Sequence, residues 1–270
     1  MDTLAKRHPV PIRVKLNELT HVYHRITKSK SKSKSLKRIR YTVSGLIKLP
    51  FPAFDADAIL KKMSPGTKFR RYKTACDADI KKQWREKGAL ACKMGTEMHA
   101  AIERFLNTTS FGPYPQNITP ELHQFWDFCY RELEPRNIVP YRTELPICAS
   151  DISLAGTVDF IGIDEENKYW LFDWKRTEGL KETANGSYGY GTSGAFKQLE
   201  NVNGIHYSLQ LHLYRLILAR YYDIDVPEDH VYIVVFHEKQ AGYRMNRAHN
   251  LHAEAADLLD RFDEWTAQTN

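Results

Sequence analysis

The feature that most constrains the fold is the segment at residues 156–176, GTVDFIGIDEENKYWLFDWKR. Two apolar runs, 154–163 and 168–175, are separated by a short polar break, which predicts two neighbouring strands. A similar run at 143–149 precedes them and predicts a third strand. Three strands so close in sequence indicate a sheet, and the apolar character of the runs indicates that helices cover it.

Helical patterns stand on both sides of these strands. The helices predicted before them span residues 55–63, 77–106 (interrupted or redirected near Gly88 and Gly95) and 120–134 (capped by Thr119, with Pro120 in the first position). The elements predicted after them are a buried helix at 207–222, a buried strand at 231–237 and an amphipathic helix at 249–266. This order predicts one α/β domain around a mixed sheet.

Positive charge is concentrated at the N-terminal end. The 270 residues carry a net charge of +6, yet residues 1–50 hold 13 basic and only 2 acidic residues. We expect 12–49 to form a hairpin whose tip is the run 28–40, KSKSKSKSLKRIR, which self-repulsion makes mobile. Two interpretations stay open, a solvated loop and a loop that contacts phosphates. The phosphate-contacting residues would be Lys30, Lys32, Lys34, Lys37 and Arg38.

Cysteine usage and hydropathy exclude several classes of protein. The four cysteines, at 76, 92, 129 and 148, are never closer than 16 residues. This spacing excludes CxxC zinc ribbons and gives no disulfide framework, so we expect a reducing, intracellular compartment. There is no run of 18 apolar residues, so we expect no membrane span and no membrane partner. The first residues lack the apolar region of a secretory signal.

The strand at 168–175 carries the first candidate site. Its period-two alternation places Asp173 and Lys175 on one face, ~7 Å apart along the backbone. Antiparallel pairing with the preceding strand would bring Asp159 beside Asp173. Two adjacent carboxylates repel each other, and a hard cation such as Mg²⁺ relieves that repulsion. The alternative is an ordinary ion pair at the end of a strand.

Two helices offer further candidates. His99 and Glu103 are one turn apart on the same face of the helix at 77–106. Gln210 and Tyr214 are similarly spaced on the apolar helix at 207–222, where buried polar groups need partners. Simple helix stabilisation and a satisfied buried glutamine remain the alternatives for these pairs.

Taken together, four short motifs occur in a fixed order. They are Gly95-x3-His99, Gly156-x2-Asp159, Asp173-x-Lys175 and Gln210-x3-Tyr214. The chain thereby resembles the RecB-type branch of the PD-(D/E)XK nuclease superfamily, which includes lambda-exonuclease-like and mitochondrial genome maintenance exonuclease-like enzymes. The resemblance spans about residues 41–240. The segments FPAFDAD and DWKR are also similar to relatives from large DNA viruses.

The resemblance implies a restriction-endonuclease-like core at 51–270, preceded by a basic arm at 1–50. It implies a DNA nuclease dependent on Mg²⁺ or Mn²⁺, an exonuclease acting on ends or single strands in replication, repair or recombination. The implied metal ligands are His99, Asp159, Asp173 and the Trp174 carbonyl, with Glu103 and Glu144 as accessory groups. Lys175 would orient or activate the attacking water. Gln210 and Tyr214 would shape the site and contact DNA.

Other expectations concern specificity and partners. Tyr188 and Tyr190, on a mobile loop at 185–194, would stack on bases, unless the loop is an ordinary connection. Arg176 is a further candidate DNA contact. No cysteine follows Cys148, so we expect no iron–sulfur cluster. The partners would be DNA and replication or recombination proteins, in the cytoplasm or nucleus, including those of a virus-infected host. The alternatives are a catalytically silent nucleic-acid-binding module and an RNA nuclease.

Overall fold

A six-stranded mixed sheet organises the computed structural model, which describes residues 3–11, 13–17, 20, 22–28, 34–108 and 118–267. Its strands are β4 (Tyr41–Thr42), β5 (Val139–Ala149), β6 (Leu154–Ile163), β7 (Tyr169–Arg176), β8 (Val231–Phe236) and β9 (Arg244–Arg247). The order is β4-β6-β7-β8-β9, and β5 pairs with β6. The β4–β6 and β7–β8 pairs are parallel, and the others are antiparallel. The predicted α/β domain with a mixed sheet is confirmed.

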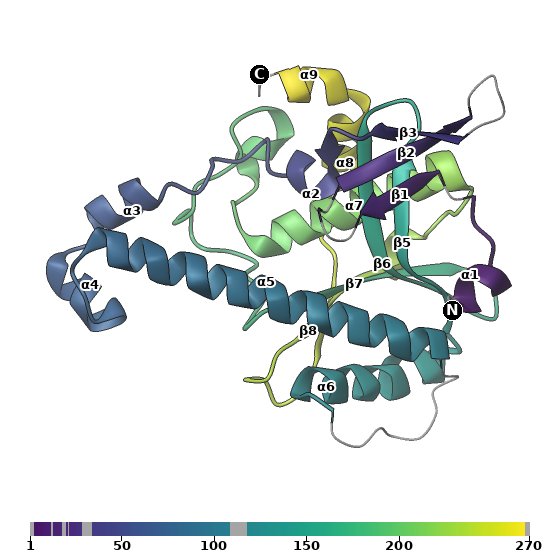
Figure 1. The fold of residues 1–270 in the computed structure, drawn as a ribbon, viewed down its shortest axis with the longest axis horizontal. Coiled ribbons are helices and arrows are strands. Elements are labelled where there is room, and N and C mark those ends of the chain that lie inside the picture. The colour runs from purple at the N-terminus through teal and green to yellow at the C-terminus, as the bar shows by residue number, and fades with distance from the viewer. Residues whose placement is uncertain are drawn as a thin grey trace.

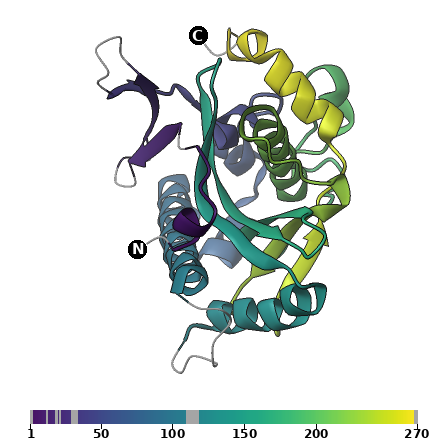
Figure 2. The same ribbon diagram turned by 90° about the vertical axis from the view of Figure 1, so that its right-hand side faces the viewer.

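Helices cover both faces of this sheet (Figures 1 and 2). The helices of one face are α2 (Val43–Leu46), α7 (Asn203–Tyr222), α8 (His252–Asp260) and α9 (Phe262–Ala267). Those of the other face are α1 (Thr3–Arg7), α5 (Asp77–Thr108) and α6 (Pro120–Phe128), the last continued by a π-helical turn, Cys129–Leu133. Short 3₁₀ turns occupy Glu134–Arg136, Gly194–Gln198 and Glu228–His230.

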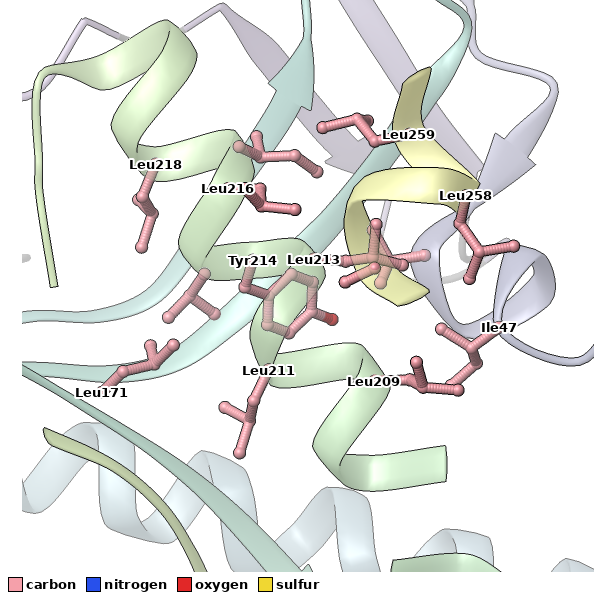
Figure 3. Packing of buried hydrophobic residues seen from close by; sticks show 14 of the residues in the cluster. Ile47, Leu171, Leu209, Leu211, Leu213, Tyr214, Leu216, Leu218, Leu258 and Leu259 are labelled. Atoms are coloured by element: carbon pink, nitrogen blue, oxygen red, sulfur yellow. The ribbon is translucent and has the colours of Figure 1, made fainter. Parts of the chain in front are cut away.

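Strand β7 divides the protein into two cores. Leu171 belongs to the core that also contains the leucines of α7 and α8 (Figure 3), whereas Phe172 and Trp174 belong to the core that contains residues of α5 and α6. The Trp174 ring makes edge-to-face contacts with Phe125 and Phe128 at centroid distances of 5.5 and 5.6 Å. The period-two alternation predicted for this strand is therefore confirmed, and it explains why the strand is apolar on both faces.

Helix α7 lies between the sheet and α8, which accounts for its unusual sequence (Figure 3). Apolar residues surround almost its whole circumference because it is covered on opposite sides. The prediction of a buried helix here is confirmed, and the helix begins at Asn203, earlier than predicted. It ends at Asp223, whose backbone takes the left-handed conformation that commonly terminates helices.

The N-terminal region forms a separate antiparallel sheet of β1 (Val14–Asn17), β2 (Val22–Lys28) and β3 (Lys34–Arg38). The loop predicted at 28–40 is wrong for Lys34–Arg38, because this segment pairs with β2 and Ser35 bonds to Thr27. Lys30 and Lys32 lie outside the described residues, as does the Lys34 side chain. From Tyr41 onward the chain joins the main sheet.

Helix α5 is continuous over 32 residues, so the predicted interruption near Gly88 and Gly95 is wrong. A single glycine costs a helix only about 1 kcal/mol relative to alanine. The surrounding Ala, Leu, Lys and Met residues are strong helix formers, and Lys82–Glu86 and Lys93–Glu97 add i,i+4 ion pairs. These local contributions to helix stability matter here because no residue between Ile80 and Met98 is buried.

Other elements differ from the expectations mainly at their ends. The predicted helix at 55–63 is α3 (Ala56–Lys62), which leads into α4 (Pro65–Tyr72), a helix not predicted from the sequence. Both lie at the N-terminal end of α5 (Figure 1). Thr119 caps α6 as predicted. The predicted helix at 249–266 is divided at Arg261 into α8 and α9. Within the described ranges, no helix has the length and hydropathy needed to cross a bilayer.

Replacing Gly88 by alanine should raise the free energy of unfolding by about 1 kcal/mol, because alanine loses less backbone entropy on helix formation. A β-carbon at position 88 meets nothing within 4 Å. Urea unfolding followed by circular dichroism measures the change. A lower midpoint for Gly88→Ala would contradict the open environment of this residue.

Candidate metal-binding site

Strands β6 and β7 separate at a point termed the fork. Their pairing runs from Ile163 with Tyr169 to Phe160 with Phe172 and stops there. Beyond it, β7 continues against β8, while β6 meets β4 only at Leu154 and Ala155. Among the described residues, 156–159 of β6 thus have no strand partner on this edge. Polar side chains from several elements meet in the opening.

Asp159 bridges the two strands at the fork. Its Oδ2 atom accepts a hydrogen bond of 2.8 Å from the backbone N–H of Trp174 on β7. Asp159 comes directly after the last paired residue, Phe160, and its charge acts on the nearby Asp173, as expected from the hairpin. Burial raises the pKa of Asp159, with the Glu144 carboxylate acting in the same direction and His99 and Lys175 opposing them.

Helix α5 brings His99 into the fork. Its Nδ1 atom lies 3.0 Å from Glu144 Oε1 and 3.7 Å from Asp159 Oδ1, and Nε2 lies 3.1 Å from the Trp174 carbonyl oxygen. Both ring nitrogens thus face oxygen acceptors, which favours the doubly protonated ring. Burial opposes protonation, but the Asp159 and Glu144 carboxylates outweigh it and raise the pKa of His99 to about 9.

Glu144 reaches the site from a strained point of β5. Its neighbours Thr143 and Leu145 pair regularly with β6, but Glu144 itself has a φ of +44°. A non-glycine residue in this conformation costs about 1–3 kcal/mol, and such strain is typical of functional sites. The strained backbone accompanies a side chain in contact with His99.

Asp173 and Lys175 form an ion pair of 2.6 Å on the same face of β7, as their alternation predicted. Asp173 is 1% exposed, and among the described residues neither of its carboxylate oxygens accepts a hydrogen bond of good geometry. Burial raises the pKa of Asp173 to about 7; Lys175 opposes this shift and the nearby Asp159 adds to it.

Helix α7 holds Lys175 from the other side. The Lys175 ammonium donates to Gln210 Oε1 at 3.4 Å and lies 4.7 Å from the centre of the Tyr207 ring. Gln210 in turn donates a 2.8 Å hydrogen bond to the Tyr214 hydroxyl. These contacts fix the direction of the lysine side chain while its charge stays beside two carboxylates.

The Tyr214 ring occupies the space where a side chain at position 156 would lie. A β-carbon at position 156 would lie 2.5 Å from Cε1 of Tyr214, closer than any real contact allows. Only glycine lets the tyrosine ring pack against β6 beside the fork. Tyr214 is buried, so it acts on the shape of the site from beneath.

His99, Glu144 and Asp159 form the group best placed to hold a metal ion. One ligand atom from each lies within 4.8 Å of the others. Carboxylate oxygens with one imidazole nitrogen suit Mg²⁺ or, better, Mn²⁺. The group includes Glu144, which the sequence indicated only as accessory. Asp173 instead pairs with Lys175, and Glu103 is not part of the group.

The remaining candidate residues lie elsewhere. Arg176 is 7% exposed at its side chain and binds Glu121 at 2.8 Å and Glu238 at 3.3 Å. Lys37 and Arg38 line a hollow of about 380 Å³ that none of the residues at the fork borders. Lys181 donates to the hydroxyl of Tyr188.

The loop at 185–194 is held by hydrogen bonds. The Glu200 carboxylate accepts from the backbone N–H groups of Ala184 and Gly186, and Thr192 N–H donates to Pro50 O. Within the described residues, Tyr188 contacts Lys181 and Tyr190 forms a β-bridge with Glu200.

Two tyrosines at the site were missed by the sequence reasoning. Tyr207 was recognisable, because it lies three residues before Gln210 on the same helix face. Tyr23 on β2 donates to, or accepts from, Thr157 Oγ1 at 2.8 Å and so ties the N-terminal sheet to β6. No local pattern could reveal this contact between residues far apart in sequence.

Comparison with known proteins identifies no relative: no protein-family model matches the chain, and no curated protein matches it significantly.

Gly156→Ala should lower the free energy of unfolding by about 1–3 kcal/mol through overpacking against Tyr214. In a Tyr214→Ala background the same substitution should cost markedly less, because the clashing ring is absent. Urea unfolding of the four proteins gives this double-mutant cycle. Equal costs in both backgrounds would show that Tyr214 is not what excludes a side chain at position 156.

Proposed function

We propose that this protein is a metal-dependent DNA nuclease with a PD-(D/E)XK core of the RecB type. The observation that carries the proposal is the convergence at one strand fork of a His–Glu–Asp group and a buried Asp173–Lys175 pair. Three of the four motifs, distant in sequence, supply His99, Asp159 and the Asp173–Lys175 pair, and β5 supplies Glu144. An ordinary ion pair at a strand end would not need them all.

The chemistry of phosphodiester hydrolysis matches this set of groups. The reaction needs a positioned water, stabilisation of the charge that develops on the phosphoryl oxygens, and help for the leaving oxygen. A bound Mg²⁺ or Mn²⁺ would polarise the phosphoryl group and supply hydroxide near neutral pH. His99, Glu144 and Asp159 would hold it, and the buried carboxylate of Asp173 stands next to them as a further oxygen donor.

Lys175 would supply a fixed positive charge. Its ammonium is held by Asp173, Gln210 and the Tyr207 ring, so it needs little reorganisation to face developing negative charge. Nearby carboxylates outweigh the effect of burial and raise its pKa, which keeps the group charged. A lysine that stays charged would act by electrostatic stabilisation and by orienting water.

The charge distribution supports a polyanionic substrate. Residues 1–50 hold 13 basic and 2 acidic residues, and strands β1 to β3 among them form a small sheet tied to β6 next to the fork. We propose action on DNA ends or single strands in replication, repair or recombination, together with proteins of those processes. Four free cysteines agree with a reducing, intracellular compartment.

A digestion panel tests the proposal directly. Linear and circular, single- and double-stranded DNA and RNA, labelled at the 5′ or 3′ end, are incubated with Mg²⁺ or Mn²⁺. We expect DNA to be cleaved, linear substrates to be preferred, and EDTA to stop the reaction. Cleavage of RNA alone would show that the substrate is RNA and not DNA. Failure to cleave any substrate would leave only a nucleic-acid-binding role.

The metal ligands can be tested without activity. His99→Ala, Glu144→Gln and Asp159→Asn should each weaken Mn²⁺ binding at least tenfold, because each removes one donor of the group. Isothermal titration calorimetry measures the affinity. Glu103→Gln is the matched control on the same helix as His99 and should bind Mn²⁺ like the wild type. Unchanged Mn²⁺ affinity in Asp159→Asn would exclude the proposed site.

Lys175→Ala should lower the single-turnover cleavage rate by about 100-fold or more, the scale of losing one preorganised charge stabiliser. DNA affinity in Ca²⁺ should fall less than about tenfold, because many other contacts bind the backbone. Cleavage at the wild-type rate would remove Lys175 from the mechanism. Joint loss of melting temperature and DNA binding would make it a structural partner of Asp173.

A further inference from the structure

A second region of positive charge lies in the helices farthest along α5 from His99. Residues 54–94, termed the helical arm, comprise α3, α4 and the N-terminal half of α5 and contain 11 basic and 5 acidic residues. Outside this arm and residues 1–50, the chain carries 15 basic and 26 acidic residues. The positive charge is thus confined to two regions attached to an acidic body.

Most cations of the helical arm are not neutralised by neighbours. Lys68, Lys81, Lys82 and Lys93 form ion pairs with carboxylates. The other seven are exposed and form no ion pair with a described residue: Lys61, Lys62, Arg70, Arg71, Lys73, Arg85 and Lys87. Solvent-exposed positive charges that are gathered on one part of the molecule create an electrostatic field that attracts a polyanion.

Large aromatic side chains are exposed among these cations. Phe54 is 73% exposed and Phe69 62% exposed, more than any other aromatic residue described. Trp84 on α5 supports Phe54 and Tyr72 through edge-to-face contacts at centroid distances of 5.7 and 5.9 Å. The exposed rings of Phe54 and Phe69 carry no polar group that needs a hydrogen-bond partner. They therefore offer flat apolar faces on which other rings can stack.

The helical arm is connected to the site at the fork. Trp84 and His99 lie on the same helix 15 residues apart, which corresponds to ~22 Å. The segment before Phe54 is bound to the loop that follows Lys175: Thr192 donates to Pro50 O and Asn201 to Pro52 O. That loop adds Tyr188 and Tyr190, both about half exposed.

We propose that the helical arm binds a single-stranded segment of nucleic acid, with bases stacked on Phe54 and Phe69 and phosphates near the seven cations. Exposed aromatic faces among basic residues are the pattern of single-strand binding, since unpaired bases can stack on them. A duplex, whose bases are already stacked, would use only the cations. The inference rests on the proposed function for its substrate class, but binding here requires no cleavage.

Fluorescence anisotropy in EDTA tests the arm independently of catalysis. Labelled dT20 and a blunt 20-base-pair duplex are titrated with wild type, Phe54→Ala/Phe69→Ala and the control Tyr130→Ala, whose side chain is 59% exposed outside the arm. The double variant should lose at least tenfold in affinity for dT20, and less than threefold for the duplex. Tyr130→Ala should bind both like the wild type.

Charge variants complete the test. Arg70→Ser/Arg71→Ser/Arg85→Ser/Lys87→Ser should flatten the dependence of log affinity for dT20 on log salt by about 0.7 per cation that contacts a phosphate. Helical content by circular dichroism verifies that each variant remains folded. Equal dT20 affinity of Phe54→Ala/Phe69→Ala and wild type would overturn the proposal. So would poly-glutamate binding as tight as dT20 binding, which would indicate an acidic protein partner.

The nuclease proposal and the helical-arm proposal can each be overturned independently of the other. The His99→Ala variant should bind dT20 like the wild type in EDTA even though it no longer cleaves. Binding of dT20 that depends on Phe54 and Phe69, in a protein that cleaves nothing, supports the arm and overturns the nuclease. Cleavage of single strands with unchanged KM in Phe54→Ala/Phe69→Ala supports the nuclease and overturns the arm.

Discussion

The hydrogen bond from Trp174 N–H to the Asp159 carboxylate is the interaction on which the site depends. A buried backbone N–H must be paired, and in a regular sheet a carbonyl of β6 would accept it. Here a side chain accepts it, so β6 and β7 can separate without leaving the donor unsatisfied. The opening then admits His99 from α5 to the Trp174 carbonyl. One carboxylate thereby holds two strands and a helix in place.

Strand β7 is fixed by packing on the face opposite Asp173 and Lys175. On β7, Asp173 and Lys175 alternate with Trp174, which is packed among aromatic rings of α6 on the opposite face. Arg176 extends this anchoring through its buried ion pair with Glu121 at the start of α6. The Asp173–Lys175 ion pair thus stands on a strand whose opposite face is held by aromatic packing. Preorganisation of this kind is what electrostatic catalysis requires.

Local patterns predicted the parts of the site that depend on local geometry. Strand alternation placed Asp173 and Lys175 on one face, and the short hairpin placed Asp159 beside them. The predicted interruption of α5 was wrong because a single glycine weakens a helix without ending it, and the surrounding residues are strong helix formers. The contact of Tyr23 with Thr157 and the left-handed backbone of Glu144 depend on tertiary structure and had no signal in the sequence.

The backbone of Glu144 has a consequence for how this chain tolerates change. Most substitutions that relieve strain stabilise a protein, so drift alone tends to remove a strained side chain from the middle of a strand. Glycine at position 144 would adopt the same φ at no steric cost, yet the chain carries a glutamate there. A glutamate at position 144 therefore costs about 1–3 kcal/mol of stability that a glycine would avoid.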